Sequence, residues 1–130
     1  LDVTCADNEK MSEVVAVTEA KQAVAKAEER LDKKEEKLDA AQAELKDHIR
    51  KHPSSIQVGD PQYGMYMTLQ RAVDIAEKEV ERADVAVQSA TARLAAAEEA
   101  LNKRMEELAA ERQRVRTLFC CAFANLCAGC

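Results

Sequence analysis

Apolar residues recur at every seventh position in both halves of the chain. The first ladder of large side chains occupies Val17, Val24, Leu31, Leu38 and Leu45, and the second occupies Val73, Val80, Val87, Leu94, Leu101, Leu108 and Val115. Alanines accompany both ladders, at Ala20, Ala27 and Ala41 and at Ala76, Ala83, Ala90 and Ala97. A sustained repeat of this kind predicts long helices that pack along one stripe and supercoil gently to the left.

The two ladders become complementary when the chain folds back at Gln57. Pairing residues equally distant from Gln57 sets Leu38 opposite Ala76 and Val17 opposite Ala97, so that a large side chain meets a small one in successive layers. Small residues on a seam let two helix axes approach closely. The sequence therefore predicts an all-α fold, a long antiparallel two-helix hairpin with an alanine-rich coiled-coil seam. We expect self-association to complete it to a helical bundle.

The expected organisation is a single helical unit over residues 1–130. Its expected parts are a first helix at about 7–52, a turn at 53–60, a second helix at about 61–118 and an apolar, cysteine-rich tail at 119–130. Thr4 or Asp7 could cap the first helix, and Pro53 ends it because proline cannot continue a helix. Asp60 with Pro61 has the pattern of an N-cap followed by the first helical residue.

Lys34 interrupts the series of small residues at Ala20, Ala27 and Ala41, and the register sets it opposite Val80. We expect its aliphatic stem to lie on the seam and its ammonium group to reach solvent, in the direction of Asp84. The alternative is that Lys34 is a polar residue that fixes the helix register.

The register fails at the open end of the hairpin, where Glu13 would face Leu101. Beyond Ala100 the second helix carries apolar side chains without an obvious partner, and we expect them to form an interaction surface. Its residues are Leu101, Met105, Leu108, Val115, Leu118, Phe119 and Phe123. Such a stripe requires a second chain, a membrane surface or a fold-back of the tail.

All five cysteines belong to this open end: Cys5, Cys120, Cys121, Cys127 and Cys130. One interpretation is a set of disulfides, which slightly favours a secreted or lumenal protein. A second is lipidation, because Arg112, Arg114 and Arg116 precede the adjacent cysteine pair. A third is a thiolate metal site that includes Cys127 and Cys130. The cysteines could also simply pack as small apolar residues.

The charge distribution and the absence of known motifs argue against several classes of function. The net charge is −5, and basic and acidic residues interleave without a long basic face, which gives no reason to expect nucleic acid. No apolar run approaches the roughly 20 residues of a membrane span, so we expect membrane association only through lipidation. The chain has no glycine-rich phosphate loop and no nucleophile elbow, and we expect neither an enzyme nor a cofactor.

Two further groups of residues lie near the turn. His48 and His52 have a spacing that can place two imidazoles on one metal, but no third ligand completes the set. The apolar tip residues are Tyr63, Met65, Tyr66 and Met67. We expect them to pack over the end of the hairpin, with partner binding as the alternative.

These patterns together predict a non-enzymatic structural or interaction protein. In this hypothesis a helical rod assembles with itself or with a partner through its cysteine-bearing open end. The first alternative is a membrane-tethered coiled-coil adaptor anchored by lipidated cysteines near the C-terminal end. The second is a thiolate metal-binding module.

Overall fold

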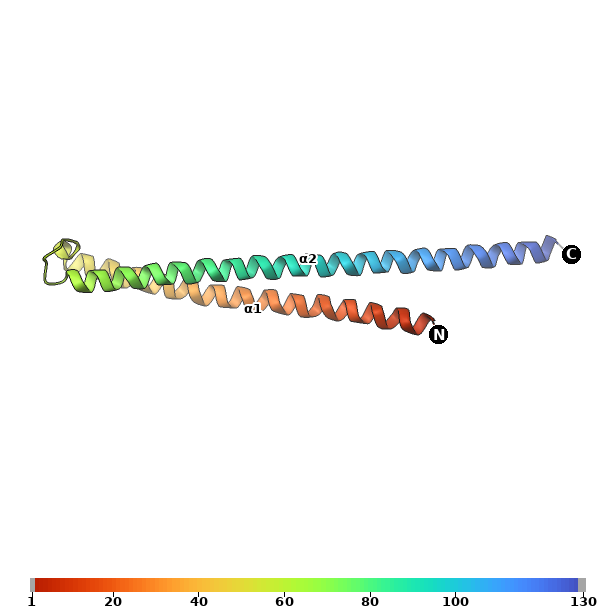
Figure 1. Ribbon diagram of the computed structural model, residues 1–130, viewed down its shortest axis with the longest axis horizontal. Helices are drawn as coiled ribbons and strands as arrows, with labels where there is room; N and C mark the ends of the chain where they lie inside the picture. The colour runs from red at the N-terminus through yellow and green to blue at the C-terminus, as the bar shows by residue number, and fades with distance from the viewer. Residues whose placement is uncertain (1, 129–130) are drawn as a thin grey trace. The chain divides into compact units, whose positions relative to one another are not determined.

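The computed structural model describes the backbone of residues 2–128, and side chains from Ser12 to Phe123. Helix α1 covers Asp2–Lys51, the short 3-10 helix η1 covers Pro53–Ile56, and helix α2 covers Tyr63–Ala128 (Figure 1). The described residues contain no strand. The predicted all-α helical hairpin is therefore confirmed.

The chain divides into two compact units, which we describe separately. One unit is residues 22–92 and contains the turn with the adjoining parts of both helices. The other combines the described residues before Gln22 with those after Ala92. The division falls inside α1 and α2 rather than at a linker.

In the unit of residues 22–92, the covered positions of both helices follow the predicted ladders. On α1 the half-buried ladder positions are Val24, Ala27, Leu31, Lys34, Leu38, Ala41 and Leu45. On α2 Val73 and Ala76 are buried, and Val80, Ala83, Val87 and Ala90 are half-buried. The alternation of large and small residues seen in the sequence is thus the alternation of the helix–helix seam.

The same spacing of covered residues continues in the second unit. Val17 is buried there, and Leu94, Ala97, Leu101 and Leu108 are half-buried. Across all described side chains the buried hydrophobic residues are Val17, Val73 and Ala76. Stability therefore comes from a narrow seam, because no broad core accumulates around it.

Lys34 occupies a seam position, but its partner differs from the expected one. Its Nζ donates to Glu79 Oε2 at 3.0 Å, and both side chains are about one-third exposed. Asp84 instead accepts a hydrogen bond from Gln88 Nε2 at 3.1 Å. Glu79 adjoins Val80, the residue that the register sets opposite Lys34, so the pair bridges the two helices at the expected level of the seam.

The turn joins the helices through a defined set of hydrogen bonds. His52 N–H donates to His48 O at 2.8 Å, and α1 ends at Lys51, just before Pro53. Gly59 has φ +95°, a left-handed conformation that residues with a Cβ rarely adopt. Asp60 Oδ1 accepts from Gln62 N–H at 2.9 Å, and Asp60 Oδ2 accepts from Ser54 Oγ at 2.8 Å.

The helix boundaries correct three expectations. Asp60 organises a turn ahead of α2 and does not cap it directly, because the helix begins at Tyr63 rather than at Pro61. Thr4 and Asp7 lie inside α1, which begins at Asp2. At the other end α2 continues past Leu118 to Ala128, through most of the predicted tail. No glycine or proline interrupts the sequence between Gly64 and Gly129, so nothing local stops this helix.

Candidate functional site

The end of α2 exposes large apolar side chains. Val115, Leu118, Phe119 and Phe123, which we call the apolar helix end, are 62–71% exposed. Every residue from Glu111 to Phe123 is exposed. Phe119 and Phe123 stack on one side of the helix, with ring centroids 6.5 Å apart.

The structure separates the expected interaction surface into two parts. Leu101 and Leu108 are half-buried and continue the seam spacing of α2, so they are less available than the sequence suggested. Met105 is exposed. Within this expected surface, the most exposed residues are therefore those of the apolar helix end.

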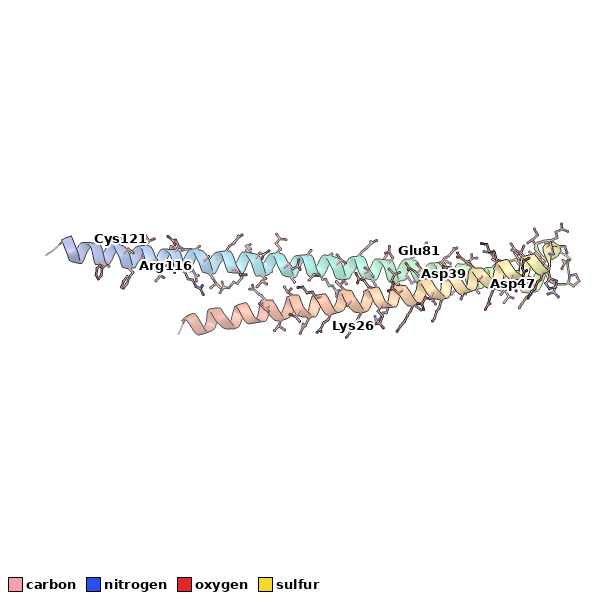
Figure 2. All side chains as sticks on the ribbon, turned by 180° about the vertical axis from the view of Figure 1, so that it is seen from behind. Lys26, Asp39, Asp47, Glu81, Arg116 and Cys121 are labelled. Atoms are coloured by element: carbon pink, nitrogen blue, oxygen red, sulfur yellow. The ribbon has the colours of Figure 1, made fainter. Side chains whose placement is uncertain are left out.

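Arginine and cysteine side chains lie on the same turns of α2 as the apolar helix end. Arg112, Arg114 and Arg116, which we call the arginine collar, are all exposed. Figure 2 labels Arg116 and Cys121 on these last turns of α2. Cys120 and Cys121 are exposed free thiols and are not bonded to each other. The side chains of Cys5, Cys127 and Cys130 lie outside the described residues, so the wider disulfide and thiolate-metal hypotheses stay predictions.

The two histidines near the turn lie side by side, with ring centroids 5.1 Å apart. His48 Nε2 is buried and has no hydrogen-bond partner. The nearby Asp60 carboxylate has a pKa below its ordinary value. The Gln62 N–H contributes most to this, followed by the Ser54 hydroxyl and then by His52 and His48. In the described part of the chain, no group of three or more His, Cys, Asp or Glu side chains is arranged to hold a metal ion.

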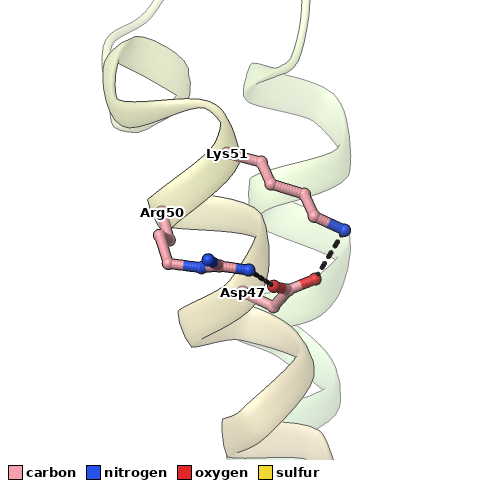
Figure 3. Close-up of polar contacts among 3 residues, drawn as sticks. All are labelled: Asp47, Arg50 and Lys51. Atoms are coloured by element: carbon pink, nitrogen blue, oxygen red, sulfur yellow. Dashed lines mark hydrogen bonds and ion pairs between the residues drawn. The ribbon is translucent and has the colours of Figure 1, made fainter.

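Asp47 anchors an ion cluster on the last turn of α1 (Figure 3). Its Oδ1 lies 2.7 Å from Arg50 Nη2, and its Oδ2 lies 2.9 Å from Lys51 Nζ. The hydrogen bonds from Arg50 and Lys51 lower the pKa of Asp47. The two cations also suit the negative end of the helix dipole, so a structural role accounts for this cluster.

The expected tip residues are only partly covered. Met65 is exposed, whereas Tyr63, Tyr66 and Met67 are half-buried, and the two tyrosine rings lie 6.2 Å apart. The sequence analysis missed Val58, whose side chain is 83% exposed in the turn. Its signal was an aliphatic residue beside Gly59 in the turn, which also carries the exposed Ile56.

A groove of ≈740 Å³ follows the seam within residues 22–92 and was not anticipated. It is lined by Ala27, Ala40, Ala83 and Ala86, by the cations Arg30, Lys33, Lys34, Lys37 and Arg82, and by the carboxylates Glu36 and Glu79. Lys34, through its hydrogen bond, and then Lys37 and Arg82 lower the pKa of Glu79. The basic residues of α1 recur here at helical spacing, and this spacing is the feature of the sequence from which the groove could have been predicted. The chain therefore has no long basic face, but Arg30, Lys33, Lys34 and Lys37 form a short one on α1.

Comparison with protein-family models, with curated proteins and with solved structures finds no match to this chain. Within the described residues, neither helix contains a stretch long and apolar enough to cross a membrane.

Proposed function

We propose that this chain is a non-enzymatic structural or interaction protein, a helical hairpin that assembles with itself or a partner through the cysteine-bearing end of α2. The apolar helix end is the observation that carries the proposal. Its four large side chains are 62–71% exposed, although covered residues recur along the seam as far as Leu108. Removing apolar surface from water contributes about 25 cal/mol per Å², so covering this segment is favourable.

The titratable groups also support a non-catalytic role. Among the described side chains, the carboxyl groups of Asp47, Asp60 and Glu79 have a pKa below the ordinary value, and hydrogen bonds or nearby cations are the cause. A lowered carboxyl pKa keeps the group ionised near neutral pH, whereas a general acid or base works best with a pKa near the operating pH. These groups suit surface ion pairing.

Sedimentation velocity under reducing conditions tests the proposal. We expect the full chain to form oligomers at micromolar concentration. Serine at all four positions of the apolar helix end should give a monomer. The matched control, Ile56→Ser with Val58→Ser, removes exposed apolar side chains from the turn and should leave assembly unchanged. A full chain that sediments as a monomer and also binds no partner through the apolar helix end, whether protein or lipid, would contradict the proposal.

A membrane-tethered coiled-coil adaptor is the second candidate function. The observation that favours it is the placement of exposed Cys120 and Cys121 directly after the arginine collar, where acylated cysteines would meet anionic head groups. Intact-mass measurement of the protein from its native cells tests this candidate. An acyl mass increment on the peptide containing Cys120 and Cys121 supports it, and unmodified thiols at both positions oppose it.

A further inference from the structure

The last turns of α2 present apolar side chains on every side of the helix. Leu118, Phe119, Cys120 and Cys121 are consecutive and exposed, and four successive residues point around the whole circumference at 3.6 residues per turn. Residues 117–128 contain no Asp, Glu, Lys or Arg. A helix that packs against one neighbour needs an apolar stripe only about 100° wide. A single second helix would therefore leave much of this surface in water.

The arginine collar immediately precedes this uncharged segment. Arg112 and Arg116 lie one turn apart on one side of the helix, and Arg114 lies on the opposite side. Glu111 is the single acidic residue after Glu107. The end of α2 is therefore locally cationic, although the whole chain carries a net charge of −5.

The length of the segment limits what it can enter. The twelve helical residues 117–128 extend about 18 Å at 1.5 Å per residue. The hydrocarbon core of a bilayer is about 30 Å thick. The uncharged part of α2 that the structure describes therefore matches the depth of one leaflet, with the arginines left at the level of the head groups.

We infer that the partner of the apolar helix end is an anionic lipid surface, into which residues 117–128 insert directly while Arg112, Arg114 and Arg116 contact lipid phosphates. This inference rests on the proposed function, because it names the partner of the same site. An acyl chain is not needed, since the helix itself supplies apolar surface on all sides. Two features favour lipid over a second copy of the chain. The apolar surface surrounds the helix, and a parallel pair would place the two arginine collars side by side.

The chain has no tryptophan, so one substitution creates a specific reporter. We would use the full chain, with unmodified cysteines under reducing conditions, carrying Phe119→Trp. Vesicles of phosphatidylcholine with an equal share of phosphatidylglycerol should shift its emission to the blue, and pure phosphatidylcholine should shift it much less. Val58→Trp, in the turn, is the matched reporter and should not shift.

The arginine collar provides a second measurement. Arg112→Gln, Arg114→Gln and Arg116→Gln together should weaken partitioning onto the anionic vesicles by on the order of 100-fold, since each arginine near the surface contributes about one factor of five. The control is Arg71→Gln, Arg82→Gln and Arg93→Gln, which changes the net charge equally at exposed positions elsewhere on α2. The control should reduce partitioning far less.

Sedimentation of the Phe119→Trp protein without vesicles separates the two proposals. Oligomers whose tryptophan emission is already blue-shifted and does not respond to vesicles would overturn the lipid inference and leave the proposed assembly standing. A monomer that ignores both vesicle types would overturn both. A monomer that shifts only with anionic vesicles, and depends on the collar, supports the inference and identifies lipid as the partner. An equal shift of the Val58→Trp protein would overturn it, because contact would not be specific to the helix end.

Discussion

Lys34 on α1 and Glu79 on α2 form an ion pair across the seam, with Nζ 3.0 Å from Oε2. The seam positions of α1 before and after Lys34 are all apolar. Its stem therefore lies at a position that Ala27 and Ala41 fill one repeat away on either side, while its charge is paired beside the seam rather than inside it. This arrangement favours a lysine that the seam tolerates over a lysine that determines the register.

We expect Lys34→Leu to stabilise the hairpin, because half-burying a leucine contributes about 1 kcal/mol and a partly exposed ion pair contributes little. Thermal unfolding measured by circular dichroism provides the test. Lys33→Leu is the control, since Lys33 is 68% exposed and pairs with Glu29 on its own helix. A loss of stability or an altered oligomer in Lys34→Leu would instead show that Lys34 fixes the register.

The alanine positions of the seam should not tolerate larger side chains. Ala76 is 8% exposed, and the register sets it opposite Leu38. We expect Ala76→Leu to destabilise the hairpin by about 1–3 kcal/mol, because extra methylenes in a packed seam force the helices apart. Ala72→Leu, one turn earlier at a less covered position, should be closer to neutral. Equal effects of the two substitutions in urea unfolding would argue against a closely packed alanine seam.

The hairpin could be predicted from the sequence because its seam is encoded by periodicity alone. Val73 and Ala76 differ in size but share a face, and the seven-residue repeat identifies that face without knowledge of the partner helix. The partner of Lys34 could not be predicted in the same way. A long side chain reaches several carboxylates near its level on the seam, and the choice between Glu79 and Asp84 depends on a rotamer and on the competing bond from Gln88.

The candidate site was predictable in composition but not in geometry. Phe119 and Phe123 were recognisable as apolar residues beyond the matched register. The continuation of α2 through Cys120 and Cys121 was not, because Thr, Phe and Cys have modest helix propensity. Only the continuous helix shows that these side chains surround the axis. The groove along the seam was missed because overall charge mixing conceals the local spacing of Arg30, Lys33 and Lys37.

Glu13 is a polar residue at a covered position in the unit that contains Val17. Its Oε2 is buried and has no hydrogen-bond partner, and the register sets it opposite Leu101. We expect Glu13→Leu to stabilise the protein by about 1 kcal/mol, because it removes an unsatisfied buried acceptor and adds apolar contact. Glu19→Leu, at an exposed position on the same helix, should have little effect in the same unfolding measurement. A destabilised Glu13→Leu would reveal a partner for this carboxylate.

Asp60 should make the turn sensitive to acid. Its pKa is lowered from 3.8, chiefly by the Gln62 N–H and then by the Ser54 hydroxyl. A lowered folded-state pKa contributes stability above the unfolded-state value, and this stability is lost as the pH falls through the folded-state value. Asp60→Asn should therefore be less stable than the parent protein at neutral pH and converge with it in acid. Melting curves of the two proteins from pH 7 to about pH 2 provide the test, and a stability difference that stays constant across this range would contradict the role of Asp60.

Two glycines near the turn should respond to alanine in opposite directions. Gly59 has φ +95°, whereas Gly64 lies in the first turn of α2, and a Cβ added at either position meets no atom within 4 Å. Gly59→Ala should therefore destabilise the protein by about 1 kcal/mol through backbone strain alone. Gly64→Ala should stabilise it by up to about 1 kcal/mol, because alanine loses less backbone entropy in a helix. Since steric clash is absent at both sites, the difference between the two melting temperatures isolates backbone conformation. Equal shifts would contradict the left-handed geometry of Gly59.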